Sequence, residues 1–228
     1  MIAVIVPIYN TEKYLRETID SVICQTLSFA EHIRLILLDD ASTDGSFAIC
    51  EQYQKQYPKQ ILVKHYDTNQ GVSALRNEGV RIAGEMGDEL ITFLDSDDKL
   101  ADDAMEKAVQ YFDAHEDVFV AAIGIRYFDA YEGEQRLNWR FEKTDVVDIK
   151  KDYTYPHYYV GGVFLRHAVL DELHFDESLS FWEDALAVNQ VIVSQGKYGL
   201  IAGTHYYYRK REDESSLVDM AWHKKERY

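Results

Sequence analysis

Continuous apolar runs alternate with helical patterns over the first 125 residues. The apolar runs lie at residues 2–8, 33–38, 61–66, 90–94 and 118–125. Runs of this length, rich in β-branched residues, predict strands that are buried on both faces. Between them, apolar residues recur at three- and four-residue steps, which is the period of an amphipathic helix. One such set is Val72, Leu75, Gly79, Ile82 and Met86. The alternation predicts an α/β fold with a mostly parallel sheet flanked by helices.

The pattern changes in the second half of the chain. Residues 126–150 mix aromatic and polar side chains around the turn-like sequence EGE, which indicates a hairpin or an excursion from the sheet. Further on, the sequence predicts helices over 163–173 and 183–195 and a last strand over 197–208. The sequence has no internal repeat, low-complexity tract or flexible linker. We therefore expect a single domain over residues 1–228 with an elaborated second half.

The composition restricts the partners and the compartment. A formal charge of −16 argues against a nucleic-acid backbone as the main partner. A site for a phosphorylated ligand must then be built locally, from a metal ion or a few placed arginines. Cys24 and Cys50 are too far apart for a CxxC motif, and we expect two buried thiols in a reducing cytosol. No apolar run approaches the roughly 18 residues of a membrane span, so we expect a cytoplasmic protein with at most peripheral association at the inner face of the membrane.

Polar loops follow four of the predicted strands. They are PIYN (7–10), DDASTDGS (39–46), DTNQG (67–71) and DSDD (95–98). Ligands in open parallel sheets bind beyond the carboxyl ends of the strands, so four polar loops at one edge predict a ligand site there. A single aspartate at a strand end is more often a helix N-cap, and Asp44 or Ser42 could serve only as caps.

The DSDD loop places Asp95, Asp97 and Asp98 close together in the sequence. Clustered carboxylates repel one another, and this repulsion raises their pKa values unless a cation or several hydrogen-bond donors hold them ionised. The sequence therefore predicts a positive partner for this loop.

Five segments of the sequence together resemble the family 2 glycosyltransferases of the GT-A fold. In order, they are VIVPIYN, ILLDDASTDGS, NQGVSALRNEG, ITFLDSDD and SFWEDALA, and the similarity extends from residue 1 to about residue 210. The resemblance implies a Rossmann-like GT-A fold with a nucleotide-sugar-binding half at 1–100 and an acceptor-binding half at 101–228. It also implies the inverting transfer of a sugar from a nucleotide-sugar, a UDP-sugar, to a hydroxyl of a glycan or lipid-linked acceptor in bacterial surface glycan synthesis. The motifs are specific for the family and do not identify the sugar.

Within this resemblance, DSDD matches the family's DxD motif, whose carboxylates hold Mn²⁺ or Mg²⁺ against the diphosphate. Hard oxygen ligands suit these cations, and the metal offsets the charge that develops on the leaving diphosphate. The match implies Asp97 as the first metal ligand, Asp95 facing the ribose or the metal, and Asp98 as a further group that supports them.

The resemblance also implies nucleotide contacts in other loops. Asp40 would accept a hydrogen bond from the uracil ring, while Pro7 and Tyr9 pack against the base. Arg76, in the LRN match, would face the diphosphate or help to hold the base loop. Two simpler interpretations stay open at this point: Tyr9 as a core aromatic residue and Arg76 as a surface arginine.

The WED segment carries the implied catalytic base. Asp184 matches the family residue that takes a proton from the acceptor hydroxyl as this oxygen attacks the anomeric carbon. Glu183 or Asp184 could instead be a first-turn carboxylate favoured by the helix dipole. Trp182 would stack on an acceptor sugar or pack in the core.

Two further stretches have weaker matches. Arg209 and Arg211 stand where related transferases bring a basic loop over the diphosphate, and a solvated charge run is the competing account. The segment VGGVFLRH (160–167) would lie near the acceptor cleft, where its glycines allow close approach. Processive synthases of the family carry QxxRW and membrane helices, and the sequence has neither, so we expect the addition of single sugars.

Two other classes of function stay open. A nucleotidyltransferase can share the GT-A architecture, but it would need a Gly-rich GxGxR-type loop after the first strand, where PIYN stands. The other class is a non-catalytic module that binds sugar nucleotides or glycans within a larger protein. The ending AWHKKERY has no helix terminator, which favours further residues in the natural protein.

Overall fold

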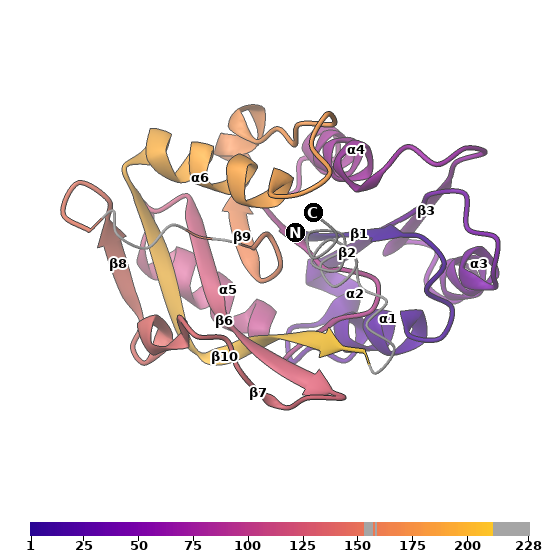
Figure 1. Ribbon diagram of the computed structural model, residues 1–228, viewed down its shortest axis with the longest axis horizontal. Coiled ribbons are helices and arrows are strands. Elements are labelled where there is room, and N and C mark those ends of the chain that lie inside the picture. Colours follow the sequence, from indigo (N-terminus) through magenta and orange to yellow (C-terminus); the bar gives the residue numbers. More distant parts are fainter. Residues whose placement is uncertain (153–156, 158, 212–228) are drawn as a thin grey trace, which may run out of the picture.

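The structure is a computed structural model that describes residues 1–152, 157 and 159–211 (Figure 1). Its strands form a ten-stranded sheet in the order β3-β2-β1-β4-β9-β6-β10-β5, with β7 paired to β6 and β8 paired to β10. The strands are β1 (Ile2–Ile8), β2 (Ile33–Asp39), β3 (Ile61–His65), β4 (Leu90–Phe93), β5 (Lys99–Leu100), β6 (Val120–Asp129), β7 (Gly133–Glu134), β8 (Asp145–Asp148), β9 (Val163–Arg166) and β10 (Lys197–Lys210). The helices are α1 (Leu15–Ile23), α2 (Phe29–His32), α3 (Ser46–Gln56), α4 (Val72–Glu85), α5 (Ala104–Ala114) and α6 (Glu183–Gln195), with 3-10 helices η1 (Asn138–Phe141) and η2 (His167–Glu172).

The first half of the chain forms the parallel part of the sheet, as the alternating pattern predicts. Strands β3, β2, β1 and β4 are hydrogen-bonded in parallel. Ile5 of β1 pairs with Ile36 on one side and with Phe93 on the other. All four strands therefore end at the same edge, and the polar loops that follow them meet there.

The second half closes the sheet and returns to that edge. β9 pairs antiparallel with β4 and β6, whereas the long strand β10 runs parallel to β6 (Figure 1). The pairing of β10 shifts register between Ile201 and His205, where Gly203 has a φ of +76° that favours glycine. Beyond this bend, β10 pairs with β5, directly after the DSDD loop. Because β10 runs in this direction, Arg209 near its end lies beside the aspartates of the DSDD loop.

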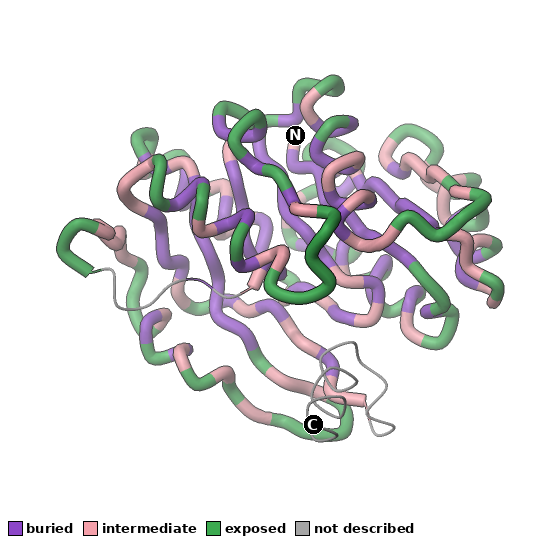
Figure 2. Tube along the Cα trace, turned by 45° about the horizontal axis from the view of Figure 1, so that its top comes forward, coloured by how far each residue is buried: buried purple, intermediate pink, exposed green. Residues whose placement is uncertain are grey.

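Two apolar cores cover the two faces of the sheet. One contains Ile19 of α1, Cys50 of α3 and Met105 of α5, and the other contains Leu75 of α4 and Val188 of α6. Figure 2 shows the strands buried between these helices, with exposed residues in the connecting loops. The layers are those of a helix–sheet–helix α/β domain, as the sequence predicts.

Helix α4 lies directly on β1 because a glycine faces the sheet. A Cβ atom added at Gly79 would lie 2.3 Å from Cγ2 of Ile5, so a larger residue would push the helix away. This contact sets the position of the first half of α4, which carries Arg76 and Asn77 towards the sheet edge.

The prediction of a helix over residues 163–173 is wrong. Residues 163–166 form β9 and residues 167–172 form η2. Val163, Phe164 and Leu165 lie in the centre of the sheet, where backbone pairing to β4 and β6 outweighs the helical spacing of the apolar residues. The helix over 183–195 is confirmed as α6, and the last strand is confirmed as β10 over 197–210. The hairpin expected within 126–150 is confirmed as β6–β7.

The expectation of two buried thiols holds for one cysteine. Burial raises the pKa of the Cys50 thiol to about 12. Cys24 is exposed, because it follows the last turn of α1 and lies outside that helix's buried stripe. Among the residues that the structure describes, no helix is both long and apolar enough to cross a membrane. The prediction of a chain that continues past AWHKKERY concerns residues outside the described part.

Candidate active site

The loops after β1 and β2 are tied to each other at the sheet edge. The Asn10 amide donates to Ser42 Oγ at 3.0 Å, and the Thr43 amide donates to Asn10 Oδ1 at 2.8 Å. Asn10 has a φ of +53° and Ala41 a φ of +60°, a left-handed conformation that is strained in residues other than glycine. Asp44 precedes the N-cap of α3, which is Gly45, and accepts the amides of Ser46 at 2.9 Å and Glu12 at 3.0 Å, so it is not itself the N-cap.

Asp40 lies at the same edge and holds the next loop. It is 3% exposed, and its two oxygens accept the amides of Gln70 at 2.6 Å and Gly71 at 2.9 Å. A carboxylate has about four lone pairs, so these two bonds leave acceptor capacity for a ligand N–H. Pro7 is buried in β1, whereas Tyr9 is 52% exposed. The interpretation of Tyr9 as a core residue is therefore wrong.

Asp98 is the most deeply buried aspartate of the DSDD loop. It is 2% exposed, and it accepts the Tyr206 hydroxyl at 2.7 Å and the Arg209 amide at 2.7 Å. The Tyr206 hydroxyl in turn accepts the Asp95 amide at 3.2 Å. Burial, followed by the charges of Asp97 and Asp95, raises the pKa of Asp98 well above its usual range. Asp98 therefore joins β10 to the loop through both of its oxygens.

Tyr206 reaches this position because glycines face its ring. A Cβ atom added at Gly161 would lie 2.7 Å from Cζ of Tyr206. The side chain that approaches these glycines is therefore Tyr206 of β10, and the expected place of VGGVFLRH near an acceptor cleft stays a prediction.

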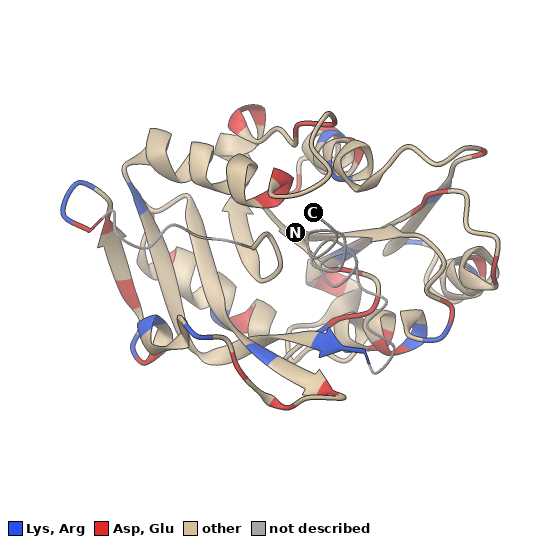
Figure 3. Ribbon diagram, in the orientation of Figure 1, with Lys and Arg blue, Asp and Glu red and all other residues tan. Residues whose placement is uncertain are grey.

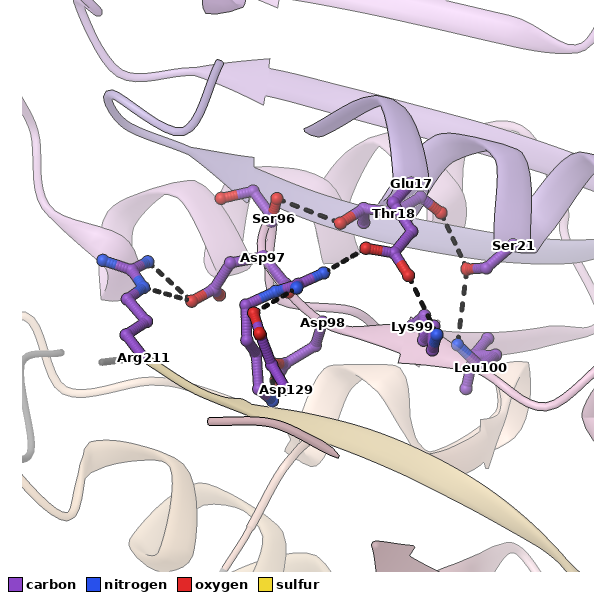
Figure 4. A network of polar contacts seen from close by, with 11 residues as sticks. Glu17, Thr18, Ser21, Ser96, Asp97, Asp98, Lys99, Leu100, Asp129 and Arg211 are labelled. Atoms are coloured by element: carbon purple, nitrogen blue, oxygen red, sulfur yellow. Dashed lines mark hydrogen bonds and ion pairs between the residues drawn. The ribbon is translucent and has the colours of Figure 1, made fainter. Parts of the chain in front are cut away.

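Asp97 is paired with an arginine from beyond the end of β10. Arg211 donates to Asp97 Oδ2 from Nη2 at 2.6 Å and from Nε at 3.0 Å (Figure 4). Arg209 Nε donates to the Asp97 carbonyl oxygen at 2.6 Å. Burial raises the pKa of Asp97, and the charge of Arg211 opposes this rise more strongly than Asp95 adds to it.

Arg209 is built into the protein and does not form an exposed basic loop. It is 7% exposed, donates to Asp129 at 2.7 Å and forms an ion pair with Glu17 of α1. Its guanidinium carbon also lies 4.7 Å from the Tyr14 ring centre and 4.4 Å from that of Phe128. The interpretation of this stretch as a solvated charge run is wrong at Arg209.

Arg76 joins the DSDD loop to the WED segment. It lies on α4 and is 5% exposed, so its interpretation as a surface arginine is wrong. Nη2 is 3.2 Å from Asp95 Oδ1, and Nη1 is 2.9 Å from Glu183 Oε1. Two motifs that are far apart in the sequence therefore meet around one guanidinium group.

Asp184 lies in the first turn of α6, beside Glu183. Its Oδ1 accepts the Ala185 amide at 2.7 Å. Burial raises the pKa of Asp184 to about 6, Arg76 opposes this shift, and the negative charge of Glu183 adds to it. A carboxylate with a pKa near the working pH suits general base catalysis. Trp182 is 55% exposed, so its interpretation as a core residue is wrong.

Two of the three aspartates of the loop thus receive positive partners from the chain itself: Arg76 pairs with Asp95 and Arg211 with Asp97. Asp98 is held by neutral donors, the Tyr206 hydroxyl and the Arg209 backbone amide, and the Arg209 side chain binds the loop backbone. Sequence reasoning identified these arginines and missed Glu17, Asp129 and Tyr206. No local signal marks them, because Glu17 and Arg209 are 192 positions apart.

The carboxylates at this site could bind a divalent cation only together with oxygens of a bound ligand. In the described part of the chain, no three Asp, Glu, His or Cys side chains are grouped to hold a metal by themselves. Mg²⁺ and similar hard cations at nucleotide sites are usually held by one or two carboxylates together with substrate phosphates. The side chains of Asp97 and Asp95 are 18% and 37% exposed and offer such a pair. The residues therefore fit a cation shared with a bound diphosphate.

This chain is similar to known proteins in sequence and in fold. The family model described as glycosyl transferase family 2 matches residues 3–174. The minor teichoic acid biosynthesis protein GgaA of Bacillus subtilis is 43% identical over 230 residues, which cover 100% of this chain and 51% of GgaA. GgaB of the same organism is 39% identical over 96% of this chain and 24% of GgaB. The chain thus spans about half of GgaA and a quarter of GgaB.

Solved structures show the same fold. S. aureus TarS (residues 1–349) in complex with UDP-GlcNAc superposes with a TM-score of 0.81 at 26% identity, over 92% of this chain and 59% of that chain. The resemblance seen in the five sequence segments is confirmed, as is the GT-A fold. The family match also decides against the nucleotidyltransferase.

Proposed function

We propose that this chain, which belongs to glycosyl transferase family 2, transfers a sugar from a UDP-sugar to a hydroxyl of a cell-wall glycan acceptor of the teichoic acid type. The observation that carries this proposal is the meeting of the DSDD loop and the first turn of α6 around Arg76. It brings a diphosphate-binding edge next to a carboxylate that can act as a base. The names of GgaA and GgaB support the acceptor class, and the UDP-GlcNAc complex of TarS supports the donor class.

On the donor side, the nucleotide lies across the ends of β1, β2 and β4. Tyr9 covers the base above Pro7, and Asp40 accepts a hydrogen bond from the uracil N–H. Asp97 and Asp95 would hold Mn²⁺ or Mg²⁺ beside the diphosphate. When bound, the metal offsets the negative charge that develops on the leaving group.

On the acceptor side, Asp184 takes the proton of the attacking hydroxyl. Its pKa of about 6 keeps most of it ionised at neutral pH, while it remains basic enough to accept a proton. The acceptor oxygen attacks the anomeric carbon on the face opposite the nucleotide, so one displacement inverts the configuration. The exposed rings of Phe181 and Trp182 lie beside Asp184 in the sequence and offer apolar surface to an acceptor.

The location follows from the two substrates. We place the reaction in the cytoplasm at the inner face of the membrane, where a soluble nucleotide-sugar can meet a lipid-linked glycan. We expect one sugar to be added per encounter with the acceptor, since residues 1–228 lack the QxxRW motif of processive synthases.

A substrate screen tests the proposal. The protein is incubated with Mn²⁺, a panel of UDP-sugars and other nucleoside diphosphate sugars, and either poly(ribitol phosphate) or poly(glycerol phosphate), and the released nucleotide is measured. We expect one UDP-sugar to give UDP release that depends on the polymer. UDP release that is the same with and without every polymer would argue against the acceptor class, and release from other nucleoside diphosphate sugars alone would argue against the donor class.

A further inference from the structure

We propose that Arg76 and Asn77, consecutive residues of α4, form a clamp that positions the segment from Phe175 to Asp184 over the donor site. The proposal rests on the proposed function, because it assigns these residues to the placement of the catalytic base. The family resemblance implied that Arg76 faces the diphosphate or helps to hold the base loop, and it implied no role for Asn77. Both are positioning residues in this account.

Asn77 holds the start of the segment. Its Oδ1 accepts the Phe175 amide at 2.8 Å, and its Nδ2 donates to the Phe175 carbonyl at 2.9 Å. The two bonds satisfy both backbone groups of one residue, so they fix its position and its orientation. Phe175 is fully buried, and its ring packs edge-on against Phe93 at 5.3 Å. The segment is therefore anchored to α4 and to the end of β4.

Arg76 holds the end of the segment. Its ion pair with Glu183, at 2.9 Å, joins α4 to the first turn of α6. Its ion pair with Asp95 joins these two helices to the DSDD loop. In Figure 3, acidic residues mark the start of α6 and basic residues lie along α4. The guanidinium carbon also lies 5.5 Å from the Phe175 ring centre. One arginine thus contacts both ends of the segment and the donor side.

The start of α6 needs this support because its own sequence does not provide it. Trp182 precedes the helix with a φ of +68°, and its side chain makes no capping hydrogen bond. A left-handed conformation costs a residue other than glycine on the order of 1–3 kcal/mol, and it persists only where the surroundings impose it. Residues 177–182 between the two anchors are exposed. The clamp therefore supplies the tertiary contacts that fix the turn before Asp184.

Stability alone does not account for Arg76. A buried ion pair often contributes little to folding, since desolvation offsets the attraction between the charges. Arg76 Nε is also buried without a hydrogen-bond partner among the described residues. An apolar side chain would fill the position without this cost, so we assign the arginine to the placement of the base.

The test compares Asn77→Ala and Arg76→Lys with Arg81→Lys, which alters a half-exposed arginine of the same helix whose ion pairs are with Glu78 and Glu85. Calorimetry with UDP and Mn²⁺ gives the donor-site affinity, and transfer is measured with the substrates found in the screen. We expect Asn77→Ala to lower kcat by about tenfold to a hundredfold, the usual effect of a small misplacement of a catalytic group. UDP affinity in this variant changes by less than about threefold, because Asn77 contacts only the acceptor-side segment.

Arg76→Lys tests the bridge itself. Lysine keeps the charge but lacks the planar guanidinium group that can bind two carboxylates at once. We therefore expect Arg76→Lys to have a lower kcat than the unaltered protein. Arg81→Lys is expected to behave like the unaltered protein. Full activity of Arg76→Lys would overturn the bridging role.

Combination with Asp184→Asn separates positioning from general destabilisation. If the clamp acts through Asp184, Asn77→Ala causes no further loss once that carboxylate is gone. Losses that multiply in the double variant would overturn the proposal, as would a fall in UDP affinity as large as the fall in kcat. If Asp184→Asn itself transfers normally, the proposed base is wrong, whatever Asn77→Ala does. Thermal melts by circular dichroism check that each variant is folded at the assay temperature.

Discussion

The substitution Tyr206→Phe tests whether β10 holds the DSDD loop in place. Tyr206 is 1% exposed, and its hydroxyl bridges Asp98 at 2.7 Å and the Asp95 amide at 3.2 Å. Phenylalanine keeps the ring and removes both hydrogen bonds. A bond to a charged group contributes about 1.5–3 kcal/mol and a neutral one about 0.5–1.5 kcal/mol. We expect the free energy of unfolding to fall by about 2–4 kcal/mol, since Asp98 stays buried with one partner fewer.

Thermal and urea unfolding followed by circular dichroism measure this loss. For a chain of this size, each kcal/mol lowers Tm by about 2–4 °C, so we expect a decrease of roughly 5–15 °C. Tyr207→Phe is the matched control on the same strand. Within the described residues the Tyr207 hydroxyl has no hydrogen bond, and its ring packs edge-on against Phe128 at 6.2 Å. Its loss of stability is expected to stay within about 0.5 kcal/mol. If both variants melted within about 1 °C of the unaltered protein, the bridging role of Tyr206 would be refuted.

Three further predictions concern the site. Because the pKa of Asp184 is raised from 3.8 to about 6, the base loses activity by protonation as the pH falls through about 6, and a plot of kcat/KM against pH gives this limb. In Glu183→Gln a like charge is removed and the limb moves to lower pH, whereas an unchanged limb would contradict the assignment. Calorimetry is expected to show that UDP binds more tightly with Mn²⁺ than in EDTA, and that Asp97→Ala removes most of this difference. Equal affinities with Mn²⁺ and in EDTA for the unaltered protein would exclude the shared cation. Asp40→Ala reduces the preference for UDP over CDP by about tenfold in competition binding, the effect of losing one buried acceptor, and a retained preference would assign base recognition elsewhere.

The parallel half of the fold and the position of the site could be predicted because both depend on local patterns. Continuous apolar runs identify buried strands, and strand order then brings their polar loops to one edge. The strand β9 could not be predicted in this way. Its residues Val163–Arg166 fit a helical spacing, and their pairing between β4 and β6 depends on segments far away in the chain.

The sequence predicted that the aspartates have positively charged partners, but not which residues these partners are. The repulsion among Asp95, Asp97 and Asp98 indicates that positive charge or donors must be near, and the resemblance suggested a metal ion. Sequence alone does not reveal that Arg76 and Arg211 supply ion pairs to two of them, because α4 and the end of β10 reach the loop only through the tertiary fold. The same holds for Asn77, whose bonds to Phe175 join residues 98 positions apart.

The role of Asp184 as the base of an inverting transfer is the central claim, and one comparison tests it most directly. Asp184→Asn keeps the shape of the side chain, and Asp113→Asn on the exposed side of α5 serves as the control. Donor affinity is measured by calorimetry, transfer by UDP release, and the anomeric configuration of the product by NMR. We expect Asp184→Asn to bind the donor nearly as tightly as the unaltered protein and to transfer the sugar at least on the order of a hundredfold more slowly. We expect the unaltered protein to give the product with inverted configuration. Near-normal transfer by Asp184→Asn would make Asp184 a helix-capping residue, and a product with retained configuration would contradict the single displacement.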